Sequence, residues 1–280
     1  MNNIRTNSIL ALAALAAFCA SPAQAQQTAY EQFRAHNASM SAVQPTWMGP
    51  LIQSDSRLSQ SLRLSVSNSY SPGAQPIVYG NNHGFCLLAA RRFQFELDPP
   101  SLFRNHSATL KDGFGNAATQ VKMRIASGNA EHGNYAVTAI VSRSYTPGSY
   151  ENGSYTGAYG PRIAVGKAFG RFNLQSTIGG VLPTGQVSLQ GRAIEWNATA
   201  QVHPNAHLFV DIENNATYFK GSSADGQTQN FITPAAFVVL RRKSWSPAHA
   251  VVVPGGGMQI ATSSFHFYNH NLIAELRVLF

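Results

Sequence analysis

The chain has 280 residues, and only 11% of them are charged, well below the ~25% of ordinary soluble domains. The formal net charge is +8, yet the longest basic run, RRK at residues 241–243, is too short to indicate a nucleic-acid-binding surface. No apolar stretch after residue 25 approaches the roughly 18 residues of a membrane-spanning helix, which leaves a secreted β-sandwich or a transmembrane β-barrel.

Residues 1–25 predict a cleaved secretory signal peptide. Arg5 precedes an apolar run from Ile9 to Phe18, and the Ala-Gln-Ala at residues 23–25 has the small residues of a cleavage site. One of the two cysteines lies within this signal, so Cys86 alone remains and cannot form an internal disulfide. We therefore expect an exported protein without a covalent cross-link.

Residues 26–57 show no sustained alternation of polar and apolar residues. We expect a short helix or coil followed by an extended lead-in, outside the main sheet. Two locations remain open for this N-terminal segment, a plug inside a barrel or a position in the periplasm. An ordinary flexible leader is the favoured interpretation.

From residue 58 to residue 280, segments with a period of two recur between Gly, Pro, Asn and Asp. Each such segment has one apolar and one polar face, as a β-strand requires. A closed barrel in a single bacterial chain has an even number of strands, so one strand is missing from the eleven visible ones or one is spurious; residues 75–80 are the best candidate for a missing strand. The visible segments are 62–67, 92–98, 120–125, 133–145, 159–169, 171–182, 193–202, 207–213, 230–243, 248–261 and 265–280.

Three features favour the barrel over the sandwich. The segments are longer than the ~5–6 residues of soluble strands and closer to the ~10 of tilted membrane strands. Aromatic residues such as Tyr135, Tyr218 and Phe267 cluster near the strand ends, where interfacial girdles lie. The polar faces carry charges of both signs, which suits a lumen. The predicted fold is an all-β, transmembrane, antiparallel up-and-down β-barrel of 10–12 strands.

Several longer motifs carry a family resemblance. The chain resembles exported outer-membrane barrel proteins grouped with the MetA-pathway of phenol degradation family. The resemblance implies a Gram-negative outer-membrane barrel with a porin-like transport role for small compounds, hydrophobic or aromatic ones included, and it brings no catalytic residue and no cofactor. The motifs, in chain order, are DGFGNAATQVKMRI (112–125), LPTG (182–185), GRAIEWNATAQ (191–201), ENNATYF (213–219), GQTQNFITP (226–234) and GGGMQIATSSFHFYNHN (255–271).

The charged residues on the polar faces are the candidate functional residues. They either form a lumen that filters or guides solutes, or pair across neighbouring strands and fill the interior. Both interpretations stay open at this stage. The predicted lumen-facing set is Arg63, Arg92, Glu96, Lys122, Arg124, Glu195, Asp211, Glu213, Glu275 and Arg277.

Metal binding and catalysis have little support in the sequence. On a strand, His266 and His270 would lie ~13 Å apart, too far to share an ion whose ligands sit ~2 Å away. No GxSxG motif occurs, and no serine has an acid or a histidine at a telling spacing. We therefore predict no metal, no cofactor and no enzymatic activity, with a barrel enzyme acting on lipid as a minor alternative.

The last segment, NLIAELRVLF, has the pattern of a final barrel strand. The apolar face with Leu272 and Leu276 would contact lipid, Glu275 and Arg277 would face the lumen, and Phe280 would lie at the membrane boundary. A terminal aromatic such as Phe280 resembles the recognition signal of the outer-membrane assembly machinery. The sequence thus predicts an outer-membrane channel or transporter, with a structural or surface-interaction barrel of closed lumen as the alternative. Its expected partners are outer-membrane lipids, the assembly machinery and an unidentified small solute, with no nucleic acid.

Overall fold

The computed structural model describes residues 23–280 except 71–74, 81–83, 107–109, 149–151 and 241–249. Two compact units divide the chain, Met1–Ser39 and Met40–Phe280. The main element described before Met40 is the helix α2, Ala23–Ser41, longer than the short helix or coil that the sequence predicts. Most of the predicted signal peptide lies outside the described residues. Within the described part of the chain, none of the helices combines the length and apolar content that a membrane crossing needs.

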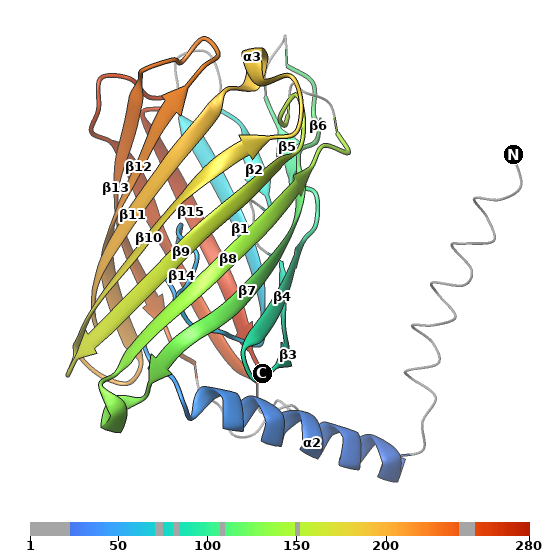
Figure 1. The fold of residues 1–280 in the computed structure, drawn as a ribbon, viewed down its shortest axis with the longest axis vertical. Helices are drawn as coiled ribbons and strands as arrows, with labels where there is room; N and C mark the ends of the chain where they lie inside the picture. Colours follow the sequence, from blue (N-terminus) through green and yellow to red (C-terminus); the bar gives the residue numbers. More distant parts are fainter. Residues whose placement is uncertain (1–22, 71–74, 81–83, 107–109, 149–151, 241–249) are drawn as a thin grey trace, which may run out of the picture. The chain divides into compact units, whose positions relative to one another are not determined.

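Residues 61–279 form one antiparallel sheet in which neighbours follow chain order and the first strand pairs with the last (Figure 1). Short helices η1, Ala130–His132, and α3, Val187–Gln190, lie in the connections. The strands are β1 Ser61–Tyr70, β2 Ile77–Tyr79, β3 Phe85–Ala90, β4 Phe93–Asp98, β5 Leu102–Arg104, β6 Gly113–Phe114, β7 Ala117–Gly128, β8 Tyr135–Tyr145, β9 Ala158–Phe169, β10 Phe172–Pro183, β11 Arg192–Val202, β12 Leu208–Lys220, β13 Thr228–Val238, β14 Val251–Ala261 and β15 His270–Leu279.

The fifteen strands occupy twelve positions in the wall, because three positions hold interrupted strands. Both β2 and β3 pair with β1, at different heights, so they are two pieces of one strand. In the same way β4 pairs with β3 while β5 pairs with β2, and β6 pairs with β5 while β7 pairs with β4. The result is a closed, antiparallel, up-and-down barrel of twelve strands, which confirms the predicted fold class.

All eleven predicted segments overlap a strand, and the missing twelfth is the interrupted pair β2 and β3, which includes part of residues 75–80. Several predicted boundaries are wrong. The segment 207–213 continues to Lys220, residues 265–269 precede β15 rather than belonging to it, and β13 ends at Val238. The segments 62–67 and 120–125 are each part of a longer strand. Residues 241–243 of the predicted segment 230–243 lie outside the described residues.

The wall is inverted relative to a soluble protein, with apolar side chains outside and polar ones inside. On β4, Leu97 is 58% exposed and its neighbour Glu96 only 7%. On β15, Leu272, Ala274 and Leu276 face outward, whereas Glu275 and Arg277 are buried, as the alternation of the last strand predicts. An apolar outer surface of this kind is typical of barrel walls that face lipid.

The interior contains a part of the chain itself. Residues 40–60, which we call the lumen segment, are largely buried and form hydrogen bonds with inward-facing side chains from strands all around the barrel. Met48 and Leu51 pack with inward apolar residues into the main buried cluster, whose other members are Phe209, Ala235, Phe237, Val239, Val253 and Ile273.

Two inward glycines give the lumen segment room against the wall. A Cβ atom built on Gly166 of β9 would lie 2.6 Å from a ring carbon of Trp47. A Cβ atom on Gly257 of β14 would lie 2.5 Å from the Pro234 carbonyl oxygen of β13 and 2.9 Å from a methyl carbon of Leu51. Non-bonded carbons normally stay ~3.5–4.0 Å apart, so a larger residue at Gly166 would push the segment away from the wall, and one at Gly257 would press on both the segment and β13.

Candidate functional site in the barrel lumen

The backbone of the lumen segment is bound by one buried carboxylate. Glu213 of β12 accepts hydrogen bonds from the amides of Leu51, Ile52 and Gln53, the last two at 3.2 and 3.3 Å. Glu213 is 0% exposed. Charge-assisted bonds from several amides to one carboxylate are the strong kind, so Glu213 is a principal attachment point of the segment.

Two arginines bind the same stretch from another part of the wall. Arg277 donates to the carbonyls of Gly49 and Pro50, at 2.5 and 2.8 Å, and Arg63 donates to the Pro50 carbonyl at 3.3 Å. Glu275 holds both guanidinium groups, with nitrogen–oxygen distances of 2.5 Å to Arg63 and 2.9 Å to Arg277. The amide donors of residues 51–53 therefore meet a negative charge, and the carbonyl acceptors of residues 49 and 50 meet positive charges.

Uncharged side chains add further bonds, which the sequence analysis did not identify. Gln201 accepts from the Met48 amide at 3.0 Å, and Gln175 donates to the Met48 carbonyl at 3.2 Å. Thr138 donates to the carbonyl of Ser56. Glutamine and threonine at alternate strand positions are also common on solvent-facing strands, so the pattern alone does not reveal a partner inside the barrel.

Within the lumen segment, Asp55 and Arg57 form an ion pair with a nitrogen–oxygen distance of 2.9 Å. Asp55 also accepts from the indole nitrogen of Trp47 at 3.4 Å. Burial by itself would raise the pKa of Asp55, but the charge and hydrogen bonds of Arg57 outweigh it and hold the pKa below its ordinary value. This ion pair is a contact within the segment itself, in addition to the bonds between the segment and the wall.

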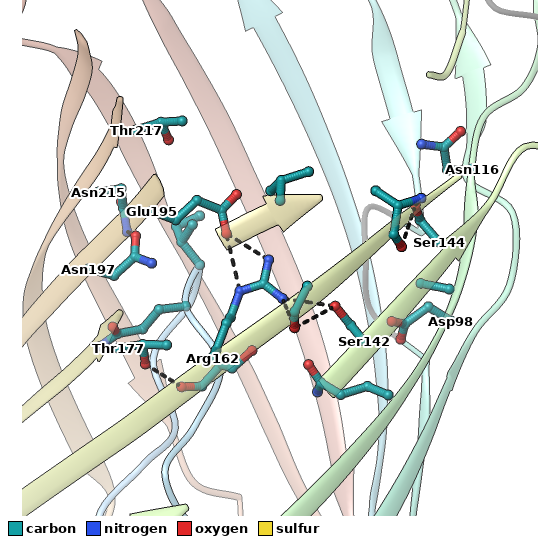
Figure 2. Close-up of a pocket in the computed structure, with 18 of the residues that line it drawn as sticks. Asp98, Asn116, Ser142, Ser144, Arg162, Thr177, Glu195, Asn197, Asn215 and Thr217 are labelled. Carbon is teal, nitrogen blue, oxygen red and sulfur yellow. Dashed lines mark hydrogen bonds and ion pairs between the residues drawn. The ribbon is translucent and has the colours of Figure 1, made fainter. Parts of the chain in front are cut away.

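Beside the lumen segment lies a cavity of about 450 Å³, bounded on one side by residues 52–54. Its wall consists mainly of amide, hydroxyl and charged side chains that project inward from the strands (Figure 2). The polar lining includes Asp98, Asn116, Gln120, Ser142, Ser144, Arg162, Thr177, Glu195, Asn197, Asn215, Thr217, Gln229 and Gln259.

Arg162 and Glu195 form an ion pair in the cavity, with a nitrogen–oxygen distance of 2.6 Å (Figure 2). Arg162 also donates to the Ser142 hydroxyl at 2.9 Å. The side chains of Arg162 and Glu195 are 18% and 27% exposed, so solvent reaches this part of the lumen. The sequence analysis missed Arg162, although its alternation with Ile163 and Val165 gives it an inward position.

The structure brings most of the ten charged candidates together around the lumen segment or the cavity. Lys122 lies 3.6 Å from Glu96 and also donates to the carbonyl of Asp55. Arg124 donates to the Met40 carbonyl at 3.4 Å, and Asp211 accepts from Gln201. Those that bind the segment directly are Arg63, Lys122, Arg124, Glu213 and Arg277. Arg92 differs from the rest, because it is exposed in the turn between β3 and β4.

The two C-terminal histidines lie apart from the lumen site. His266 precedes β15, and its ring nitrogens bond to the Ser263 carbonyl and the Asn269 side chain at 2.8 and 2.9 Å. The ring of His270 stacks on that of Tyr70, with 4.6 Å between the ring centroids. Both rings thus have partners close to the ends of β14, β15 and β1.

No family model matches the chain, and no curated protein sequence matches it either. The fold is similar to that of solved outer-membrane proteins. The COG4313 outer membrane channel from Pseudomonas putida F1 aligns with a TM-score of 0.58 at 12% identity, over 84% of this chain and 100% of the other. The NanC porin aligns with a TM-score of 0.51 at 9% identity, over 78% and 98%.

At these identities the similarity establishes the fold alone, which is that of outer-membrane barrels. The resemblance to the MetA-pathway family stays a prediction.

Proposed function

We propose that the chain is an outer-membrane channel for small, polar molecules. The observation that carries the proposal is the cavity of about 450 Å³, whose lining consists mainly of amide, hydroxyl and charged side chains. Such a lining replaces the hydration shell of a polar solute by hydrogen bonds, whereas a hydrophobic solute would gain nothing from it. The polar lining therefore favours polar solutes over the hydrophobic or aromatic ones that the family resemblance implies.

A second candidate function is a structural or surface-interaction barrel with a closed lumen. The specific observation in its favour is the lumen segment, which occupies part of the interior and is bound by side chains on several sides. In the channel proposal the same segment narrows the passage and sets the size of the solutes that pass.

The channel and the closed barrel differ in the expected permeability of the lumen to small solutes. The test uses purified, folded protein, with folding verified by its different gel mobility before and after boiling in detergent. In liposome-swelling assays with a size series of neutral sugars and polyols, a channel gives swelling rates that fall with solute size. No swelling above empty liposomes, for the native protein and for a variant with a loosened lumen segment (Glu213→Ala with Arg277→Ala), would support the closed barrel instead.

The cellular setting is also part of the proposal. Residues 1–25 direct export, the apolar outer face contacts outer-membrane lipids, and Phe280 at the end of β15 serves the assembly machinery. The support is the exposed apolar wall and the position of Phe280, whose amide donates to the Gln60 carbonyl at 3.1 Å and whose side chain is exposed. Removal of Phe280 is expected to lower the amount of folded protein in outer-membrane fractions, while a Phe280→Tyr control is expected to leave it unchanged.

A further inference from the structure

The charged residues that line the cavity are paired, with one exception. Among the described lining residues, each charged side chain other than Asp98 lies within 4.0 Å of an opposite charge. These pairs are Lys122 with Glu96 at 3.6 Å, Arg162 with Glu195 at 2.6 Å, and Arg63 with Glu275 at 2.5 Å. Asp98, at the end of β4, takes part in none of them.

One carboxylate oxygen of Asp98 is also without a hydrogen-bond partner in the described part of the chain. The residue is 7% exposed, and its Oδ1 atom is buried without a partner. Figure 2 shows the side chain of Asp98 on the cavity wall, on the same side as Ser142 and Ser144. A buried carboxylate oxygen that lacks a donor is costly, and such groups in native structures call for an explanation.

The wall next to Asp98 has space for a small group. Asp98 pairs with Ala118 of β7, and Ala118 pairs with Ser144 of β8, so the three residues form an inward row across neighbouring strands. Strands lie ~4.8 Å apart, which places the backbones of Asp98 and Ser144 about 10 Å from each other. Because Ala118 carries only a methyl group, a niche remains between a carboxylate and a hydroxyl.

We propose that Asp98 and the niche over Ala118 form a subsite for the ammonium group of a small, polar solute. This inference rests on the proposed function, since the solute must enter the lumen. An ammonium group has several hydrogen-bond donors and a positive charge. It therefore supplies Asp98 with a donor and with an opposite charge at close range. The Ser144 hydroxyl already accepts from the Ala158 amide at 2.9 Å and donates to the Ala158 carbonyl at 3.4 Å, which leaves its second lone pair as a further acceptor.

A divalent metal ion fits this place less well. The other carboxylate on the inner face of β4, Glu96, already accepts from Gln120 at 2.7 Å and pairs with Lys122. In the described part of the chain, no group of three or more His, Cys, Asp or Glu side chains could hold a metal ion. One free carboxylate beside neutral hydroxyls matches a monovalent organic cation.

The test compares three probes of nearly equal size, n-propylammonium, 1-propanol and propionate. Their binding to the purified, folded protein is measured by ligand-observed saturation-transfer NMR. Propylammonium is expected to bind more tightly than the other two. Asp98→Asn is expected to weaken its binding about ten- to hundredfold, the loss expected when a hydrogen bond to a charged group is removed.

A second variant tests the niche without changing any charge. Ala118→Val fills the space between Asp98 and Ser144 and is expected to abolish propylammonium binding. The matched control is Asp225→Asn, which removes an exposed loop carboxylate paired with Lys220 and is expected to leave binding unchanged. Heat-dependent gel mobility checks that all variants are folded.

Equal binding of the three probes, or propylammonium binding that survives in Asp98→Asn, would overturn the subsite. Liposome swelling is measured on the same samples, so that the two proposals fail separately. Swelling by neutral solutes without propylammonium binding rejects only the subsite. Probe binding without any swelling rejects the channel and leaves a solute-binding barrel.

Discussion

At the scale of single residues, Glu213 has the largest expected effect on the lumen segment. Replacement by Ala leaves the amides of Leu51, Ile52 and Gln53 without this acceptor, and each unsatisfied buried group costs about 1–3 kcal/mol. The segment is therefore expected to leave its position while the wall stays closed. Glu213→Gln keeps one acceptor oxygen and should have a smaller effect.

This prediction is measured by protease cleavage after Arg57, which is protected while the segment is buried. Glu213→Ala should be cleaved faster than the native protein, with Glu213→Gln between them. Equal rates in all three proteins would mean that Glu213 does not hold the segment.

A second residue-scale prediction concerns pH. Because the pKa of Asp55 is below its ordinary value of about 4, its ion pair with Arg57 stabilises the segment above that pH, and the contribution is lost as the pH falls through the lowered value. Trp47, which contacts Asp55, reports the change. In a Trp196→Phe, Trp245→Phe background, its fluorescence should shift to the red below pH ~4.

The control for this titration is Asp55→Asn, which has no carboxylate to protonate. Its emission should not change over the acid range in which the parent's shifts. A shift of the same size in both proteins would assign the acid transition to another group.

At the scale of the elements, Gly166 of β9 and Gly180 of β10 allow a matched comparison of a glycine that contacts the lumen segment with one that does not. Gly166→Ala places a Cβ atom against Trp47 and is expected to destabilise the segment by roughly 1–3 kcal/mol, the usual cost of overpacking. Gly180→Ala meets only the Ala193 carbonyl, at 3.4 Å, and should be nearly neutral.

Denaturant titration of Trp47 fluorescence compares these two variants with the native protein. A lower midpoint for Gly166→Ala alone agrees with close contact between β9 and the lumen segment. Equal midpoints would show that the segment moves aside without cost.

The strands could be predicted from the sequence wherever polar and apolar side chains alternate along them. Segments such as those of β4, β11 and β15 carry polar inner faces, so their period of two was visible in the sequence. Residues 85–90, FCLLAA, gave no such signal, because Leu88 faces inward and packs with Met40 and Leu58 of the lumen segment. The same cause explains Phe209, an apolar residue on an otherwise polar face.

Breaks in the alternation therefore mark where the lumen segment touches the wall. The charged inner positions were visible as a set, but their partners were not. The bonds of Glu213 and Arg277 reach across more than 150 residues to backbone atoms, which carry no sequence signature. The niche beside Asp98 depends likewise on the register of three strands, which a pattern within one strand does not contain.

At the scale of the whole molecule, the barrel wall is expected to fold without the lumen segment inside it. A variant that lacks residues 40–56 keeps all twelve strand positions and the apolar outer face, and water can hydrate the polar inner residues that the segment leaves. Twelve strands lie between the filled eight-stranded barrels and the open sixteen-stranded ones. We therefore expect a folded barrel with larger single-channel conductance than the native protein in planar bilayers.

The native protein measured in the same bilayers is the reference for this deletion, and gel mobility before and after boiling reports its folding. A folded deletion variant with native conductance would mean that residues 40–56 do not limit the passage. An unfolded variant would mean that the segment contributes to forming the wall.

The direct connection of the lumen segment to β1 has a mechanical consequence. Tension applied to the chain ahead of residue 40 would load the bonds of the segment one after another, as in peeling. The ten residue pairs that join β1 to β15 would instead share the same load in shear. The segment should therefore yield at low force while the wall remains intact, so that pulling would widen the passage without opening the barrel.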